Sequence, residues 1–219
     1  MASLCSHTRW TRSIRAFIAT LLLAAGLATA TVATPAAAAG GFDDVPDGQW
    51  YSDAVAWMAD TGITTGTSAT TFSPGDPVSR AQMAAFIERY LQTEGDPGAH
   101  GFGDVPSGSY YDGAVSLLVD RGITTGTSAT TYSPQDRVTR AQMAAFLWRL
   151  AGQPEPTVAN PFDDVADGTW YTDAVRWLVG EGITTGTSDT TYSPFDDVTR
   201  AQMATFLWRL ADEPLVGEQ

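Results

Sequence analysis

The sequence predicts an all-α protein in which three tandem helix-loop-helix repeats close on one another. From Phe42 onward the same pattern returns at intervals of 60 residues, so that Phe102 and Phe162 open the second and third copies. Each copy carries two segments with apolar residues at helical spacing, separated by a loop rich in Gly, Ser and Thr. Because two short amphipathic helices cannot bury their apolar faces alone, the copies must pack together.

The repeats are expected at residues 40–94, 102–153 and 161–213, with linkers near 95–98 and 153–156, where Gly and Pro gather. An open array of repeats usually ends in polar capping repeats. Here the first and last copies are as apolar as the middle copy. We therefore expect closure into one pseudo-three-fold domain of roughly 175 residues, a size that suits a single core.

The first helix of each copy is expected at residues 53–61, 113–121 and 173–181, after a Phe-x-Asp-Val segment and a pair of aromatic residues. Val55 and Met58 mark its apolar side in the first copy. Gly62 suits the left-handed position that ends a helix, and Ile63 can supply the apolar contact that accompanies such an end. Apolar residues, a Gly and an Ile stand at the equivalent positions of the other copies.

The second helix of each copy begins with a capping box. In the first copy Ser79 precedes the helix and Gln82 follows three places later, so that each side chain can bond the other's backbone N–H. Met83, Phe86 and Ile87 then recur at helical spacing. The other copies repeat the box with Thr139 and Gln142, and with Thr199 and Gln202.

An Arg at the first position of each second helix is not explained by capping, because the helix macrodipole disfavours a cation there by roughly 0.3–1 kcal/mol. One explanation is a salt bridge to the Asp of the Phe-x-Asp-Val segment. The other is anion binding, in which the guanidinium and the adjacent helix N-terminus supply donors. A second Arg near each helix end suits the dipole and needs only a structural role. The first set is Arg80, Arg140 and Arg200, the second set is Arg89, Arg149 and Arg209, and the Asp candidates are Asp44, Asp104 and Asp164.

Residues 1–39 are predicted to be a secretory signal peptide. Three arginines precede an apolar run from Ala16 to about Ala30, and Ala37-Ala38-Ala39 offers a cleavage site. The run is too short for a transmembrane anchor, which needs roughly 20 apolar residues. Removing the peptide takes 3 of the 12 basic residues and none of the 25 acids, which leaves a net charge of 9 − 25 = −16. A chain so acidic, and without Lys, is a poor partner for nucleic acid.

Taken together, these motifs resemble the S-layer homology module, and the resemblance covers essentially the whole mature chain. It rests on Phe-x-Asp-Val, the aromatic residue before the first helix, Gly-Ile-x-x-Gly, Phe/Tyr-x-Pro and Ser/Thr-Arg-Ala-Gln, which occur in this order three times. The resemblance implies a three-lobed spindle in which the second helices form a central bundle and ligands bind in grooves between lobes. It also implies non-covalent attachment to a secondary cell-wall polysaccharide, which is often pyruvylated.

The ligand groove of such modules contains the Arg of a Thr-Arg-Ala-Glu motif. The matching positions here are Arg80, Arg140 and Arg200. The usual Glu is Gln in every copy, which preserves the capping box but removes a charge. These residues are Gln82, Gln142 and Gln202.

Two further sets of residues are candidates for the groove. The first aromatic residue of each pair could stack on a sugar, although packing in the core is the favoured interpretation because large aromatics dominate small cores. A Gly in the following loop would allow either close approach of a ligand or a turn that a side chain would obstruct. Neither of these two interpretations is preferred. The sets are Trp50, Tyr110 and Trp170, and Gly66, Gly126 and Gly186.

The predicted function is that of a secreted, non-catalytic protein of the bacterial cell wall and cell surface that binds an anionic secondary cell-wall polysaccharide. No cofactor, metal or catalytic residue is predicted. The mature chain has no Cys, its one His is His100, and the spacing of Asp43, Asp44 and Asp47 does not fit a calcium loop. Nucleic acid and a membrane anchor in the mature form are not expected. The alternatives are an adaptor for other envelope proteins and a carboxylate-dependent wall hydrolase.

Overall fold

The computed structural model describes residues 39–212, and the predicted signal peptide lies outside this part of the chain except for its last residue, Ala39. The outer helices α1, α3 and α5 span Ser52–Asp60, Asp112–Asp120 and Thr172–Gly180, one residue earlier than predicted. The central helices α2, α4 and α6 span Arg80–Leu91, Arg140–Leu150 and Arg200–Leu210, and a short 3-10 helix, η2, spans Ala39–Gly41. Residues 39–212 contain isolated β-bridges but no strand, which confirms the all-α prediction.

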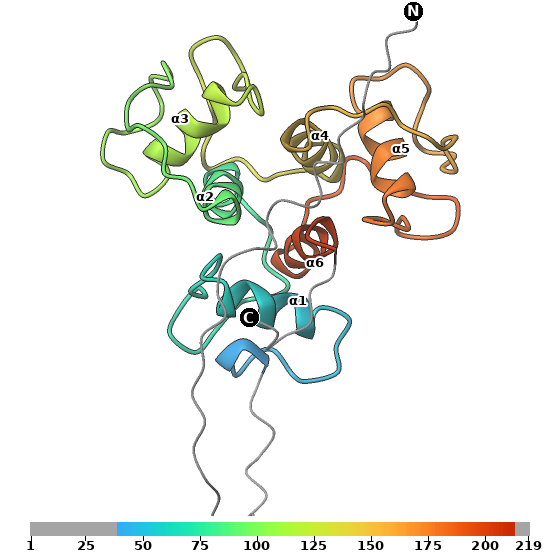
Figure 1. Ribbon diagram of the computed structural model, residues 1–219, viewed down its shortest axis with the longest axis horizontal. Helices are drawn as coiled ribbons and strands as arrows, with labels where there is room; N and C mark the ends of the chain where they lie inside the picture. The colour runs from blue at the N-terminus through green and yellow to red at the C-terminus, as the bar shows by residue number, and fades with distance from the viewer. Residues whose placement is uncertain (1–38, 213–219) are drawn as a thin grey trace, which may run out of the picture.

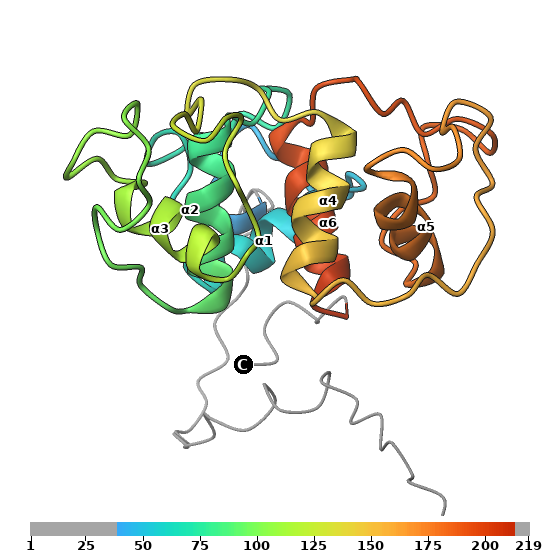
Figure 2. The ribbon, with the colours of Figure 1, turned by 90° about the horizontal axis from the view of Figure 1, so that it is seen from above.

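Three central helices each pack against one of three outer helices. In the end-on view of Figure 1, α2, α4 and α6 surround the centre while α1, α3 and α5 lie outside them, and Figure 2 shows the central helices from the side. Each central helix packs against the outer helix of the following repeat: α2 against α3, α4 against α5, and α6 against α1. The last of these contacts joins the third repeat to the first, which confirms the predicted closure.

A ring of three backbone hydrogen bonds lies where the repeats meet. The Val78 N–H donates to Val198 O, the Val138 N–H to Val78 O and the Val198 N–H to Val138 O, each at 2.9 Å. All three valines are fully buried. Because each valine both donates and accepts, this valine ring is complete only when all three repeats are present.

Each central helix begins at its predicted capping box. The Ser79 Oγ accepts the Gln82 N–H at 3.2 Å, and the Gln82 Oε1 accepts the Ser79 N–H at 3.0 Å. The same two bonds open α4 and α6. Behind the cap, Met83 and Ile87 are fully buried and Phe86 is nearly so, which confirms the predicted apolar face. Such a cap stabilises a helix by about 1 kcal/mol.

The Asp of each Phe-x-Asp-Val segment clamps the loop that precedes the central helix. Asp44 accepts the Phe72 N–H on Oδ1 and the Ser73 N–H on Oδ2, each at 2.7 Å. Ser73 has a φ of 59°, in the left-handed region, which is unfavourable for a residue other than Gly. The two bonds to the carboxylate help to offset that strain. Asp104 and Asp164 form the same clamp in the other repeats.

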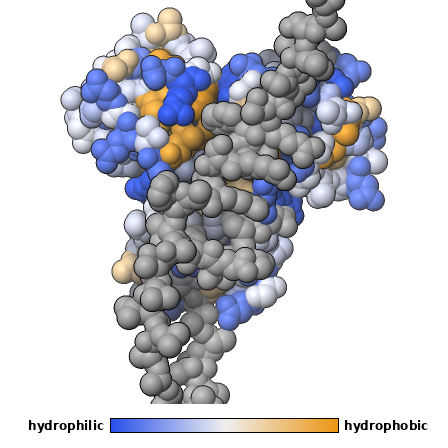
Figure 3. Space-filling model, in the orientation of Figure 1, coloured by the Kyte–Doolittle hydropathy of each residue, from blue (hydrophilic) through white to orange (hydrophobic). Residues whose placement is uncertain are grey.

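On the face drawn in Figure 3 hydrophilic residues predominate, and apolar residues gather mainly over the lobe of α2 and α3. Between residues 39 and 212 no helix has the length and apolar character needed to cross a membrane. The large apolar side chains that are exposed in this range are Trp50, Tyr110, Trp170 and Phe195.

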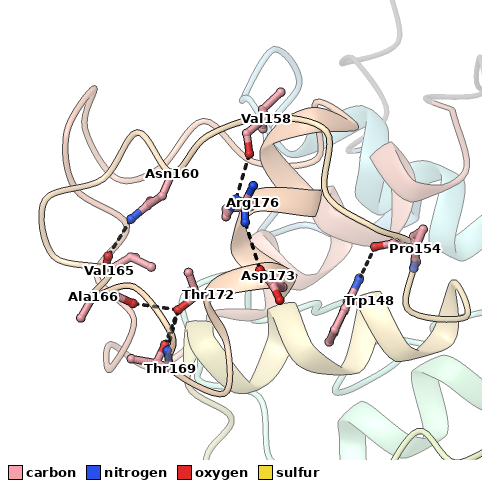
Figure 4. Close-up of polar contacts among 10 residues, drawn as sticks. All are labelled: Trp148, Pro154, Val158, Asn160, Val165, Ala166, Thr169, Thr172, Asp173 and Arg176. Atoms are coloured by element: carbon pink, nitrogen blue, oxygen red, sulfur yellow. Dashed lines mark hydrogen bonds and ion pairs between the residues drawn. The ribbon is translucent and has the colours of Figure 1, made fainter.

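The linker between the second and third repeats is tied to the helices on both sides of it (Figure 4). Trp148 of α4 donates its Nε1–H to Pro154 O at 2.8 Å. Arg176 of α5 donates its Nε–H to Val158 O at 2.9 Å. These bonds fix the path of the linker from one lobe to the next.

The linker between the first and second repeats is tied by a buried His–Asp pair instead. Asp112, the first residue of α3, accepts the Gly98 N–H at 2.7 Å and the Gly108 N–H at 2.8 Å. Its Oδ1 lies 3.2 Å from the Nε2 of His100. The Nδ1 of His100 accepts the Phe102 N–H at 2.9 Å, which requires a neutral imidazole. The positions equivalent to Asp112 hold Ser52 and Thr172.

Candidate ligand-binding site

A cleft of about 280 Å³, which we call site 1, is lined by residues of all three repeats. Its walls come from the loop after α1, from α2, from the segment before α3 and from the start of α6. The lining residues are Thr64, Thr65, Gly66, Thr67, Gln82, Ala85, Phe86, Arg89, Tyr110 and Arg200. Because the third repeat packs on the first, the equivalent positions can be followed round the ring of repeats. One repeat further on they define site 2, which includes Trp170 and Arg80, and two repeats further on they define site 3, which includes Trp50 and Arg140.

The structure brings the predicted kinds of site residue together, but it takes them from different repeats. Site 1 combines Gly66 and Gln82 of the first repeat with Tyr110 of the second and Arg200 of the third. The Arg and the Gln of one Ser/Thr-Arg-Ala-Gln motif therefore belong to different sites. Each repeat completes the sites of its neighbours, which the order of motifs along the chain does not reveal.

The arginine of site 1 is a buried cation. Arg200 is 3% exposed, and its Nε–H donates to Phe72 O at 2.6 Å. Its guanidinium carbon lies 4.5 Å from the centre of the Phe72 ring and 5.5 Å from that of the Phe86 ring, so that aromatic faces stabilise the charge. Burial lowers the pKa of Arg200, but the group remains charged. Its Nη2 is buried without a hydrogen-bond partner, as are those of Arg80 and Arg140.

The salt bridge offered as one explanation of these arginines is not formed. Within the described chain, no ion pair involves Arg80, Arg140 or Arg200. The candidate Asp residues use their carboxylates on the loop clamps. At Asp104, burial alone would raise the pKa, but the backbone N–H groups that it accepts outweigh burial, so the pKa lies below its ordinary value. Aromatic rings and carbonyl oxygens, not a carboxylate in contact, therefore surround each cation.

The start of the helix does not supply free donors to the site either. The N–H groups of Arg200 and Ala201 donate to carbonyl oxygens of the first repeat, at 2.9 and 3.0 Å. The next N–H, that of Gln202, donates to the capping oxygen of Thr199. The expectation that the helix N-terminus adds backbone donors is therefore wrong at these positions. The free donor is the guanidinium itself.

The second set of arginines also reaches the site. Arg89 lines the cleft, and its Nη1–H donates to Ile63 O at 3.2 Å. The predicted structural role is confirmed, because this bond ties the end of α2 to the loop of its own repeat. Its place in the wall of the cleft was not predicted, since a position near a helix end does not show what faces it. The equivalent bonds run from Arg149 to Ile123 O and from Arg209 to Ile183 O.

The aromatic residues before the outer helices are exposed, so their predicted packing in the core is wrong. Trp50, Tyr110 and Trp170 are 61%, 62% and 57% exposed. In the second repeat it is the next residue, Tyr111, that turns inward and is 6% exposed. The two rings meet edge to face with their centres 5.0 Å apart. The pair thus supplies one core residue, Tyr111, and one exposed residue, Tyr110, that lines site 1.

The glycine of each loop is explained by its turn. Gly66 has a φ of 79°, and a Cβ there would lie 2.5 Å from the Phe42 ring and from the carbonyl oxygens of Ser68 and Thr71. Both the left-handed backbone and the lack of space exclude a side chain. Gly66 also lines site 1, so the turn brings the loop backbone to the cleft. Gly126 and Gly186 have the same surroundings.

Residues 41–84, 101–144 and 161–204 each match the S-layer homology domain, and together these matches cover more than half of the chain. The chain belongs to the S-layer homology family. This membership confirms the family that the repeated motifs predicted, and with it a place at the bacterial cell surface.

This S-layer homology chain is similar to the S-layer proteins of Bacillus thuringiensis subsp. finitimus and Bacillus licheniformis, at 30% identity over 202 residues and 31% over 204. Each alignment covers 90% of this chain, but 24% and 22% of the relative. The chain is also similar to an amylopullulanase of Thermoanaerobacterium thermosulfurigenes, at 29% identity over 78% of this chain and 10% of that enzyme. It thus spans less than a quarter of the length of these relatives.

Proposed function

We propose that the chain attaches non-covalently to an anionic polysaccharide of the bacterial cell wall through sites 1, 2 and 3. The observation that carries the proposal is the unpartnered Nη2 of Arg200, which is buried at the cleft of site 1. A buried donor without an acceptor costs about 1–3 kcal/mol, and a charged donor costs more. A carboxylate or phosphate of a ligand would remove that cost. Membership of the S-layer homology family supports a cell-wall polymer as the source of this anion.

The other residues of site 1 suit a sugar that carries an acidic group, such as a pyruvyl substituent. A guanidinium forms strong, directional hydrogen bonds to a carboxylate. The aromatic face of Tyr110 can pack against the C–H face of a sugar ring, because the face of an aromatic ring is negative. Thr65, which lines the cleft, has a hydroxyl group that can donate to and accept from those of a sugar. The hydroxyl of Thr67 bonds Thr71 and Ser73 within its own loop.

Binding explains site 1 better than hydrolysis does. Hydrolysis of a glycosidic bond by the common mechanisms needs two carboxyl groups that flank the bond. None of the residues that line site 1 carries a carboxyl group. The amylopullulanase is similar to this chain over 10% of its own length, which leaves most of that enzyme outside the similar region. We therefore propose an attachment module without catalytic activity of its own.

Sedimentation with purified cell walls tests this proposal. The mature chain should pellet with untreated walls and remain in solution after the secondary polysaccharide has been removed chemically. Retention on bare peptidoglycan would show that a different polymer is bound. Retention that depends on wall proteins would favour the adaptor alternative.

The exposed aromatic residues allow a test that does not disturb the fold. Replacing Trp50, Tyr110 and Trp170 together with Ala should weaken wall binding about tenfold or more. Each site loses a contact of about 0.5–1.5 kcal/mol, and losses at linked sites multiply. The melting temperature should change little, because all three side chains are more than half exposed. The matched control is Arg137→Gln, an exposed residue outside the lining of site 1, which should leave wall binding unchanged.

A further inference from the structure

Phe195 is the most exposed of the large apolar side chains in residues 39–212, at 72%. The fold does not require it, because the equivalent positions of the other repeats hold Gly75 and Gln135. A single exposed apolar residue is ordinary. Phe195 is not single, however. Its ring meets that of Tyr171 edge to face at 6.0 Å, and Tyr171 meets Trp170 in the same way at 5.1 Å.

These three rings form one aromatic row that begins at site 2. Trp170 occupies the position that Tyr110 has in site 1. Phe195 follows Pro194, whose carbonyl oxygen accepts the Ala141 N–H at the start of α4, at 2.8 Å. Helix α4 is the wall of site 2 that corresponds to α2 in site 1. The row therefore leads from site 2 onto the adjoining surface.

We propose that Trp170, Tyr171 and Phe195 form a platform that extends site 2 and packs against a further sugar ring of the bound polysaccharide. This inference rests on the proposed function and adds a ligand contact to one of its three sites. Tyr171 is 5% exposed and sits between two rings that are 57% and 72% exposed, so the platform is fixed before the ligand arrives. Site 2 accordingly binds a longer stretch of the polymer than site 1 or site 3.

A sugar ring suits this platform better than a second copy of the chain. The C–H groups of a sugar face are complementary to the negative face of an aromatic ring. Asp196 and Asp197 lie next to Phe195 in the sequence. A second mature chain would bring a further net charge of −16 to this acidic segment, and repulsion between like charges would oppose the contact. A polysaccharide whose acidic group is bound at Arg80 of site 2 can present a neutral sugar ring at Phe195, and this ring brings no such repulsion.

The test uses the mature chain with Trp50→Ala and Tyr110→Ala, which weakens sites 3 and 1 and leaves site 2 as the strongest site. The probes are the acidic monosaccharide and an oligosaccharide, both released from the purified secondary polysaccharide and titrated by isothermal titration calorimetry. Adding Phe195→Gln, the residue of the second repeat, should weaken binding of the oligosaccharide about threefold to tenfold. Binding of the monosaccharide should not change, because it reaches only the cleft.

The converse variant transfers the platform to site 1. Gln135 is exposed and occupies the position of Phe195, so Gln135→Phe should not disturb the fold. In a chain with Trp50→Ala and Trp170→Ala, in which site 1 dominates, it should strengthen binding of the oligosaccharide by a similar factor. Binding of the monosaccharide should again stay constant.

The possible outcomes separate this inference from the proposed function. If the parent chain binds both probes and Phe195→Gln changes both equally or neither, the platform is refuted and the proposed function stands. If the parent chain binds neither probe, both proposals fail. If sedimentation velocity shows a dimer that Phe195→Gln abolishes, Phe195 forms a dimer interface and the platform is refuted.

Discussion

Two triplets of arginine, one at each end of the central helices, differ in what they connect. The N-terminal triplet reaches other repeats, with bonds of 2.6 Å from Arg80 to Tyr132 O, Arg140 to Tyr192 O and Arg200 to Phe72 O. The C-terminal triplet stays within its own repeat, as Arg89 does in its 3.2 Å bond to Ile63 O. The first triplet is buried, whereas the second is in part open to solvent.

The difference shows that arginine can stabilise contacts between repeats at one end of a helix and contacts within a repeat at the other. The helix macrodipole acts locally and accounts for a cation at the end of a helix. It opposes a cation at the start, and Arg80, Arg140 and Arg200 stand there because their partners lie in another repeat. A residue placed against its local preference thus marks a contact between repeats.

The largest expected effect comes from removing one partner of two of the three helix contacts between repeats. Deleting residues 160–219 uncovers the faces of α1 and α4 that pack on α6 and α5, and removes Val198 from the valine ring. Because the remaining repeats cannot close, the truncated chain should lack a cooperative thermal transition, measured by circular dichroism. A truncated chain that melted cooperatively near the full-length temperature would show that two repeats are a stable unit.

A large but local effect should separate the two triplets. Arg140→Gln removes a bond to a buried carbonyl oxygen, worth about 1–3 kcal/mol, and the contacts with the Tyr192 and Phe206 rings. Removal of the dipole-unfavourable buried charge and of its unpartnered Nη2 offsets part of this loss. We expect a net decrease of about 2–3 kcal/mol in the free energy of unfolding, measured with urea.

The matched substitution lies at the other end of the same helix. Arg149→Gln removes one bond to Ile123 O from a partly exposed side chain, so we expect a decrease of about 1 kcal/mol or less. Equal losses from Arg140→Gln and Arg149→Gln would mean that the contact between repeats stabilises the fold no more than the bond within a repeat.

Acid should weaken the loop clamps that position the carbonyl partners of the N-terminal triplet. Burial would raise the pKa of Asp104, but its backbone hydrogen bonds lower it below the unfolded value of about 3.9. Its stabilising contribution is therefore present above that value and is lost as the pH falls through the folded pKa. Asp104→Asn should be less stable than wild type at pH 6, and the difference should shrink towards pH 2. Urea unfolding at several pH values measures it, and a difference that stayed constant with pH would argue against the clamp.

A modest effect in the opposite direction concerns the one junction of the N-terminal triplet that lacks a hydroxyl. The Tyr132 OH donates to Arg80 O at 2.9 Å, but Phe72 has no hydroxyl to offer Arg200 O. Phe72→Tyr should therefore raise the free energy of unfolding by about 0.5–1.5 kcal/mol in urea unfolding. Tyr132→Phe should lower it by a similar amount. A loss of stability in Phe72→Tyr would mean that the third junction has no room for the hydroxyl.

Much of the fold could be predicted because the responsible residues act over short distances. The box formed by Ser79 and Gln82, and the helix end at Gly62, each depend on a few neighbouring positions. The closure could be predicted as well, since an open array would need polar residues in its first and last copies.

The site could be predicted in its residue types but not in its assembly. The family resemblance implied grooves between lobes, but a spacing of 60 residues does not show which repeat supplies which residue. That Arg200 would meet Gly66 and Tyr110 was therefore not predicted. The exposure of Trp50 could not be predicted either. Both members of the Trp50-Tyr51 pair are large aromatics, and only the packing around them decides which one turns inward.

The valine ring also bears on how the protein resists tension. The described chain enters at η2 and leaves after α6, and both elements pack on α1. In an open row of repeats, a force on one end would separate the repeats one after another. Here a pull beyond residue 212 acts on the junction of α6 with α1 and on the bonds among Val78, Val138 and Val198 together. Separating the third repeat from the first therefore requires both the helix junction and the valine ring to break.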